Sequence, residues 1–267
     1  MAFLYAFIIA VLLLLLYMYL ETGWLKVEYV DQSKSRSGLK ILQLSDLHVY
    51  MLGVSAEKVR KVVKAENPDV IILTGDYVNE PMHASAFLEY LRSITKGYRT
   101  LLCLGNHDFR AFKGNRKGLD NFIKEIEALQ VEVLHNRSVV VEKGSSKYNF
   151  IGIEDLREGR PDIEKALKNT LPDIPRIAFT HNPDLALHIP GKIVDYLFCG
   201  HFHGGQIWMP WNLEFFLLRK DELCKMGLRR GLHRVNDMKV YISRGLGNVV
   251  VPLRFLSRPE ITVVYLN

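Results

Sequence analysis

The sequence predicts an α/β fold that is preceded by one membrane-spanning helix. Between residues 39 and 130, short apolar runs of strand length alternate with amphipathic segments that have the period of a helix. The chain begins with a long apolar segment that carries no charge. Five of the apolar runs end in Asp, Asn or His, which indicates that functional side chains lie in the loops that follow the strands.

The N-terminal segment Ala2 to Leu20 comprises nineteen residues without a charge, and a helix needs ~20 apolar residues to cross a bilayer. A secretory signal peptide would carry basic residues before this core and a small-residue cleavage site after it, and neither is present. The segment therefore predicts a transmembrane anchor over residues 1–22.

The residues that flank this segment predict how the anchor is oriented. Tyr17, Tyr19 and Trp24 are placed as an interfacial aromatic belt, and basic residues occur only downstream, from Lys26 onwards. By the positive-inside rule, the body of the protein should lie in the cytoplasm and the N-terminus outside. A linker is expected over residues 23–38, and one domain over 39–267.

Composition limits the class of protein but does not select a substrate. The chain has 267 residues, of which 48% are hydrophobic and 24% charged, so it can bury a full core and is not disordered. Its net charge of +6 fits nucleic acid, an anionic membrane or a phosphorylated substrate equally well. Cys103, Cys199 and Cys224 are odd in number and form no CxxC pair, which argues against a disulfide framework and a cysteine zinc site.

Three helices are expected in the first half of the domain. Ser55 can cap a helix that Asn67 and Pro68 end, and apolar faces predict two more, over Ser85 to Thr95 and Leu119 to Leu129. More closely spaced strands follow, separated by turn-forming residues. The expected strands are Val131 to Leu134, Val139 to Val141, Tyr148 to Ile153, Lys239 to Ser243 and Ile261 to Tyr265.

Side chains that can bind a metal ion directly follow five of the apolar runs. They are Asp46 and His48, Asp76, Asn106, His181, and His201 and His203. Oxygen and imidazole ligands without thiolate favour divalent metals such as Mn, Fe, Zn or Mg. The set is larger than one ion can use, so it predicts two ions. Two ions ~3.5–4 Å apart need a bridging carboxylate. They generate a hydroxide and stabilise both oxygens of an in-line displacement at phosphorus.

These motifs, in this order, resemble the calcineurin-like metallophosphoesterase family. The resemblance covers about residues 39 to 266, because Gly204-Gly205-Gln206 and the tail from Ser243 to Glu260 are similar to its small bacterial branch of membrane-anchored or exported members. It implies a four-layer α-β-β-α sandwich with two mixed sheets, in addition to the N-terminal helix. It also implies a metal-dependent phosphoric ester or pyrophosphate hydrolase that uses two divalent ions, with manganese the first choice.

The resemblance further implies a role for each residue of the motifs. One ion would be held by Asp46, His48 and His203 and the other by Asn106, His181 and His201, with Asp76 bridging the two. His107 would face the substrate without binding a metal, and would stabilise charge on the phosphoryl oxygens or protonate the leaving group, with Asp108 orienting it. Four histidines occur in no such context and are expected to be structural: His83, His135, His188 and His233.

The stretch from Ile207 to Arg234 has no counterpart in these motifs. It contains four aromatic residues followed by basic ones, and the candidates for a membrane-surface contact are Trp208, Trp211, Phe215, Phe216, Arg229 and Arg230. The alternative is a core strand followed by a solvated basic loop, and the sequence does not decide between them.

The anchor and the resemblance together predict hydrolysis of a membrane-associated lipid. The concrete expectation is UDP-2,3-diacylglucosamine, cleaved to lipid X and UMP in lipid A biosynthesis, by a monomer in the inner membrane of a bacterium. An anchored phosphodiesterase of nucleotides or other soluble diesters is the alternative. A nuclease would need a basic and aromatic groove, for which only Ile207 to Arg234 could serve. A non-catalytic scaffold is the third hypothesis, and the complete ligand set argues against it.

Overall fold

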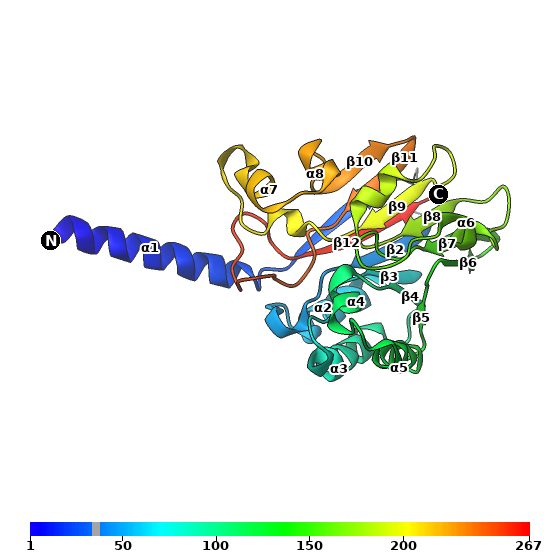
Figure 1. The fold of residues 1–267 in the computed structure, drawn as a ribbon, viewed down its shortest axis with the longest axis horizontal. Helices are drawn as coiled ribbons and strands as arrows, with labels where there is room; N and C mark the ends of the chain where they lie inside the picture. Colours follow the sequence, from blue (N-terminus) through cyan, green and yellow to red (C-terminus); the bar gives the residue numbers. More distant parts are fainter. Residues whose placement is uncertain (34–37) are drawn as a thin grey trace.

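The computed structural model describes residues 1–33 and 38–267, without the side chains of residues 212 and 216–218. It contains two mixed six-stranded sheets that pack face to face (Figure 1). The first has the order β1 (Lys26–Asp31), β12 (Glu260–Leu266), β2 (Leu39–Leu44), β3 (Val70–Thr74), β4 (Thr100–Cys103), β5 (Val131–Val133). The second has the order β10 (Gly231–Val235), β11 (Met238–Ile242), β9 (Tyr196–Cys199), β8 (Arg176–Phe179), β7 (Ser146–Gly152), β6 (Arg137–Lys143).

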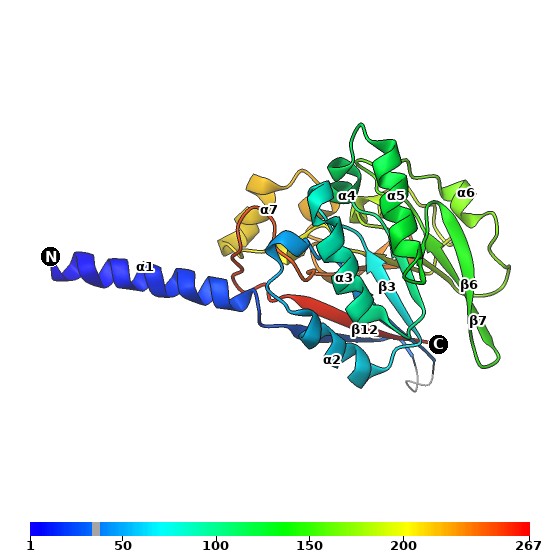
Figure 2. The same ribbon diagram turned by 90° about the horizontal axis from the view of Figure 1, so that it is seen from below.

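Helices cover the outer faces of both sheets. Figures 1 and 2 show three of them on the first sheet: α2 (Ala56–Glu66), α3 (Ala84–Thr95) and α5 (Arg116–Glu127). The other described helices of the body are α4 (Asn106–Ala111), α6 (Ile163–Leu167), α7 (Leu213–Leu218) and α8 (Glu222–Lys225). The helix and strand positions confirm the α/β prediction, and the two mixed sheets confirm the architecture that the resemblance implied.

Alternation along the strands accounts for the layers. In β2, Leu42 and Leu44 point to the helices of the first sheet, whereas Leu39 and Ile41 point to the second sheet. Because both faces of this strand are covered, it reads as a nearly continuous apolar run. Such strands are recognisable in a sequence, and β2, β3, β4, β8 and β9 all lie where the apolar runs predict them.

The N-terminal helix α1 (Ala2–Glu21) projects from the body and is exposed along nearly its whole length (Figures 1 and 2). Its mean hydropathy is 2.6 over an 18-residue window, so it is long and apolar enough to cross a membrane.

The segment after α1 differs from the expected linker, since strand β1 lies within residues 23–38 and pairs in parallel with β12. As an edge strand β1 is only partly buried, which explains its polar sequence.

The stretch from Ile207 to Arg234 also contains more regular structure than the sequence predicts. It forms α7, α8 and most of β10, and β10 pairs with β11 at the edge of the second sheet. The side chains of β10 alternate between half-buried and exposed positions up to the buried Val235, because only one face of this edge strand meets the core. This stretch is therefore part of the domain, with its apolar side chains divided between the core and the surface.

Candidate metal centre

The predicted ligands come together where the strands of both sheets end. Asp46 and His48 follow β2, Asp76 follows β3 and Asn106 follows β4, all in the first sheet; His181 follows β8 and His201 and His203 follow β9 in the second. The first three of these strands are parallel to one another, and so are β8 and β9, so each sheet delivers its loops at the carboxyl ends of its strands.

Two buried clusters of ligand atoms result, and each fits one ion. Asp46, His48 and His203 form the first, and Asp76, His181 and His201 the second; within each, the ligand atoms lie within 4.8 Å of one another. The carboxylate of Asp76 also reaches the first cluster, because its Oδ2 is 2.9 Å from Nε2 of His181 and 3.6 Å from Nε2 of His48. The carboxylate of Asp76 thus lies between the two clusters.

The chemistry of the donor atoms also fits divalent metal ions. Within the described part of the chain, the buried Oδ1 of Asn106 and Nε2 of His48 have no hydrogen-bond partner. Buried polar atoms are nearly always paired, and an absent ion would leave such atoms without partners. Burial lowers the pKa of His48 to about 4 and that of His201 to about 3, so both are neutral at pH 7, as metal ligation requires.

Hydrogen bonds on the far side of three histidines fix which nitrogen faces the metal position. Nδ1 of His181 donates to the carbonyl of Thr74 at 2.7 Å, and Nδ1 of His203 donates to that of Gly247 at 3.3 Å. Nδ1 of His48 donates to Oδ1 of Asn79 at 2.8 Å. When each ring is neutral, as metal ligation requires, its lone pair is therefore on Nε2, the atom that belongs to the metal cluster.

His201 is oriented the other way round. Its Nδ1 lies 3.1 Å from Nε2 of His181, inside the site, and its Nε2 lies 3.4 Å from Oδ1 of Asp221. Asp221 is buried at the start of α8 and also binds Arg157. The sequence motifs did not indicate Asp221, because it comes from the stretch that the resemblance leaves unexplained.

The backbone of these loops is strained at the ligands themselves. Five of the seven have a positive φ, between 40° and 72°: Asp46, His48, Asp76, His201 and His203. This region is uncommon for residues other than glycine, and it persists where the surrounding structure enforces it, often at functional sites. Gly200 shows how close the loops lie, since a Cβ there would meet Oγ of Ser45 at 1.9 Å.

The structure assigns the orientation of His107 to Asn79 rather than to Asp108. Nδ2 of Asn79 donates to Nδ1 of His107 at 2.8 Å, so the proton of a neutral His107 is on Nε2. The carboxylate of Asp108 is buried and accepts backbone N–H groups of Gly105, Asp76, Tyr77 and Val78. Asp108 therefore holds two ligand loops together and does not contact the ring of His107 as the sequence led us to expect.

The residues that were expected to be structural lie outside the two clusters. His83, His135, His188 and His233 belong to neither cluster, and His83 stacks on Tyr50 with 5.2 Å between the ring centroids. Cys103, Cys199 and Cys224 are buried thiols.

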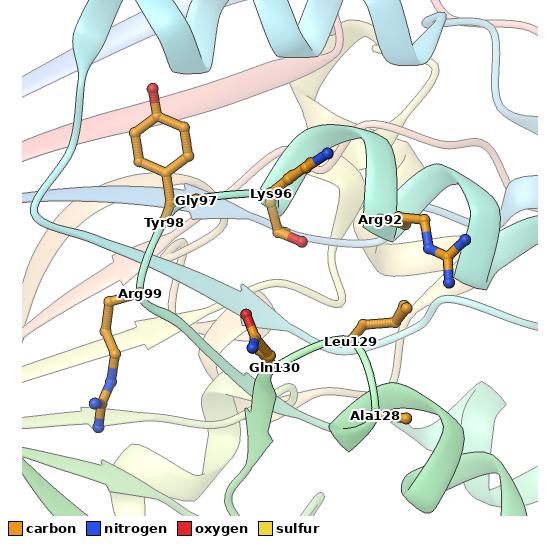
Figure 3. A pocket seen from close by; sticks show the side chains of 9 residues that line it. Arg92, Lys96, Gly97, Tyr98, Arg99, Ala128, Leu129 and Gln130 are labelled. Carbon is orange, nitrogen blue, oxygen red and sulfur yellow. The ribbon is translucent and has the colours of Figure 1, made fainter.

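A cleft of about 620 Å³ opens beside the metal centre. His107, His201, His203 and Asp76 form its floor. The other lining residues are Tyr50, Gly205, Gln206, Ile207, Met209, Glu214, Phe215, Arg219, Val249, Val250 and Val251. A hollow of about 710 Å³ lies elsewhere, around Arg92, Lys96 and Arg99 (Figure 3). It contains none of the predicted site residues, and Arg99 is paired with Glu132 at 2.6 Å. The predicted site residues therefore belong to the cleft and not to this hollow.

The six residues proposed for membrane contact differ in exposure. Trp211 is 83% exposed, whereas Phe215 is only 4% exposed. The guanidinium of Arg229 covers Phe215, with its Cζ 4.8 Å from the centroid of the ring. Trp208 and Arg229 are partly buried, and Arg230 is exposed. The side chain of Phe216 lies outside the described part of the structure. Trp211 is thus placed to meet a surface, and Phe215 belongs to the core and the wall of the cleft.

Comparison with known proteins adds a family and several relatives. Residues 39–205 match the family model described as Calcineurin-like phosphoesterase. The chain is 32% identical over 245 residues to the uncharacterized metallophosphoesterase YkoQ of Bacillus subtilis, covering 91% of this chain and 88% of YkoQ. It is 30% identical to the phosphodiesterase YaeI of Escherichia coli, covering 93% and 90%. It is 27% identical to the UDP-2,3-diacylglucosamine pyrophosphatase LpxG of Chlamydia muridarum, covering 92% and 90%.

Proposed function

This chain belongs to the calcineurin-like phosphoesterase family, and from this premise we propose that it hydrolyses a phosphoester or pyrophosphate bond of a lipid that resides in the membrane. The hydrolase class follows from the family and its relatives. Our proposal concerns the lipid, the roles of the individual residues and the metals.

The metal roles follow the two clusters. Asp46, His48 and His203 would hold one ion, His181, His201 and Asn106 the other, and Asp76 would bridge them. Two bound ions supply a hydroxide nucleophile and stabilise the attacking and leaving oxygens of the displacement. Manganese is our first choice, since the ligands are oxygen and imidazole without thiolate.

The chain's own residues would position the substrate and supply a proton. His107 lines the cleft, and its Nε2–H can donate to a phosphoryl oxygen or to the departing oxygen. Arg219 lines the same cleft, and no carboxylate lies within ion-pair distance of its guanidinium among the described residues. Its charge is therefore available to a phosphate group of the substrate.

One observation carries the lipid proposal: the last turn of α1 is hydrogen-bonded directly to the body, with no linker between them. The amide of Arg254 donates to the carbonyl of Met18 at 3.0 Å, and the amides of Leu256 and Ser257 donate to the buried carboxylate of Glu21 at 3.0 and 2.9 Å. Ser257 in turn donates its hydroxyl to the carbonyl of the ligand His203 at 3.0 Å.

The length of α1 supports a body that lies close to the bilayer surface. Its 20 residues span about 30 Å at ~1.5 Å per residue, which is the thickness of the hydrocarbon core. Because the last turn of α1 contains the buried Met18 and Glu21 and is bonded to the body, a membrane-spanning α1 would hold the body at the bilayer surface. All three tryptophans of the sequence, Trp24, Trp208 and Trp211, occur in segments near this end, and tryptophan is enriched at membrane interfaces.

The similarity to LpxG supports UDP-2,3-diacylglucosamine as the substrate, with lipid X and UMP as products. The similarity to YaeI supports a second candidate, a phosphodiesterase that acts on soluble diesters. We further propose a monomer in the inner membrane, with the catalytic domain in the cytoplasm. A C-terminal fusion to a green fluorescent protein should then fluoresce, whereas an active C-terminal alkaline phosphatase would place the domain outside.

A substrate panel tests the lipid proposal. The full chain in lipid nanodiscs with Mn²⁺ is offered bis-p-nitrophenyl phosphate, a phosphomonoester, a UDP-sugar and the diacylated UDP-sugar, with Asp76→Ala as the blank. We expect the diacylated substrate to have the highest kcat/KM. Turnover of the soluble UDP-sugar at an equal or higher kcat/KM would favour the second candidate.

A further inference from the structure

The cleft beside the metal centre combines apolar walls with a buried carboxylate, that of Glu214, which belongs to neither metal cluster. We propose that it is a binding subsite for an acyl chain of the substrate, in which Glu214 accepts a hydrogen bond from a hydroxyl or amide group near the base of that chain. This inference rests on the proposed lipid substrate. It adds the place where the acyl chain binds and the kind of lipid that the enzyme prefers.

The apolar part of the cleft has two walls that are fixed relative to the metal ligands. Ile207, Met209 and Phe215 form one wall, and the segment from Val249 to Val251 forms the other. The side chain of Gln206 joins them, because its Nε2 donates to the carbonyls of Val249 and Val251 at 2.9 and 3.0 Å and its Oε1 accepts the amide of Val249 at 2.8 Å. The volume of about 620 Å³ falls in the usual range for sites of small ligands.

Glu214 is the buried polar group in these walls. It is 2% exposed, and its Oε2 accepts the amide of Met209 at 3.0 Å. Its Oε1 has no hydrogen-bond partner among the described residues and lies over Gly205, where an added Cβ would be 3.0 Å away. An unpaired buried carboxylate oxygen is costly. A phosphate would be repelled by it, whereas a hydroxyl or amide N–H of a ligand would satisfy it.

Two exposed apolar side chains lie beside the cleft: Val250 is one of its lining residues, and Trp211 lies in the sequence between the lining residues Met209 and Glu214. Val250 is 89% exposed and Trp211 is 83% exposed, and both have a positive φ, 66° and 55°. A β-branched residue is rare in this conformation. Contact with water alone does not favour this backbone conformation for an apolar side chain. Figures 1 and 2 show α7 and the segment between β11 and β12 at the end of the body from which α1 leaves. This side of the cleft therefore meets the bilayer surface, so that a chain can pass from the leaflet into the cleft.

The first test is a chain-length series with a narrowed cleft. The full chain in nanodiscs with Mn²⁺ hydrolyses p-nitrophenyl alkyl phosphodiesters from ethyl to decyl, and each protein's kcat/KM is normalised to its ethyl ester. In the parent, each buried methylene should raise this value by up to about four-fold. Val249→Phe fills part of the cleft, so the normalised kcat/KM of this variant should stop rising at shorter alkyl chains. For the decyl ester it should be at least about ten-fold lower than that of the parent.

A matched control makes the comparison specific. Val140→Phe adds the same side chain on β6, at the opposite end of the body (Figure 1), and should follow the parent at every length. Partition of the esters into nanodiscs is the same for all proteins, so it cancels in the ratio. If Val249→Phe folds poorly by circular dichroism or loses Mn²⁺, Val251→Phe replaces it. Equal chain-length profiles in the parent and a folded, metal-containing variant would overturn the acyl subsite.

The second test concerns Glu214. Glu214→Gln keeps the shape and can still accept the amide of Met209, but it removes the charge that faces the cleft. The parent should prefer a 3-hydroxydecyl ester over the decyl ester by about ten-fold, because a hydrogen bond to a charged group is formed, and the variant should lose most of this preference. The same ratio in both proteins would contradict the role of Glu214.

The two proposals fail in different ways. If the parent shows the chain-length profile but does not cleave the diacylated UDP-sugar, the substrate in our proposed function is wrong and the subsite stands. If the parent cleaves that lipid and the profiles of parent and narrowed variant coincide, the subsite is wrong and the proposed function stands.

Discussion

Asn79 connects a metal ligand to the residue that faces the substrate, so its replacement should affect two measurable quantities. Its Oδ1 accepts from Nδ1 of His48 and its Nδ2 donates to Nδ1 of His107, both at 2.8 Å. Asn79→Ala removes both bonds. A neutral hydrogen bond contributes about 1 kcal/mol net, so we expect about five-fold weaker binding of one metal ion through His48. Loss of the second bond leaves the ring of His107 free to rotate. At saturating metal, kcat should therefore be about five- to ten-fold lower than in the parent.

A double-mutant cycle separates the two effects. Metal affinity is measured by titration with Mn²⁺, and kcat with bis-p-nitrophenyl phosphate at saturating Mn²⁺, for the parent, Asn79→Ala, His107→Ala and the double variant. If Asn79 acts on turnover through His107, its effect on kcat should disappear in the His107→Ala background, while its effect on metal affinity remains. Full additivity of the two effects on kcat would refute the reasoning.

Three further predictions concern the ligands and the anchor. Asp76→Ala should abolish turnover and lower the metal content, whereas His107→Ala should reduce turnover and leave the metal content intact; equal metal loss in both would show that His107 is a ligand. Asp221→Asn should weaken binding of the ion at His201 about ten-fold, because Asp221 orients that ring; two unchanged Mn²⁺ affinities by calorimetry would exclude this. Deletion of Met1 to Leu20, with Glu21 retained, should leave hydrolysis of a soluble diester nearly unchanged and lower turnover of lipid in liposomes, and equal losses on both substrates would contradict the separate role of the anchor.

The clustering of the candidate ligands was predictable because each of them follows a buried strand. Asp46, Asp76 and His181 come after runs that are apolar on both faces, and parallel strands deliver their carboxyl ends to one edge of a sheet. Local sequence therefore carries the information. The same holds for α2, where Ser55 caps the first turn and Asn67, with φ of 45°, ends the helix.

The supporting residues were not predictable in this way. Asp221 reaches His201 from a segment that follows it by 20 positions, and nothing in the local pattern distinguishes it from a solvated acidic residue. Three of the four backbone amides that Asp108 accepts belong to another loop, at Asp76, Tyr77 and Val78, which a sequence does not display. Strand β1 was not predicted because an edge strand needs only weak apolar alternation when its partner β12 supplies the hydrogen bonds.

The central claim is that the two buried clusters form one dinuclear site with Asp76 between the ions. Electron paramagnetic resonance of the full chain, titrated with Mn²⁺ and combined with metal analysis, tests it most directly. We predict two Mn²⁺ ions per chain and an exchange-coupled signal, which Asp76→Ala converts to that of uncoupled ions or abolishes. A single ion per chain at saturation, or two ions with no coupling in the parent, would contradict the claim.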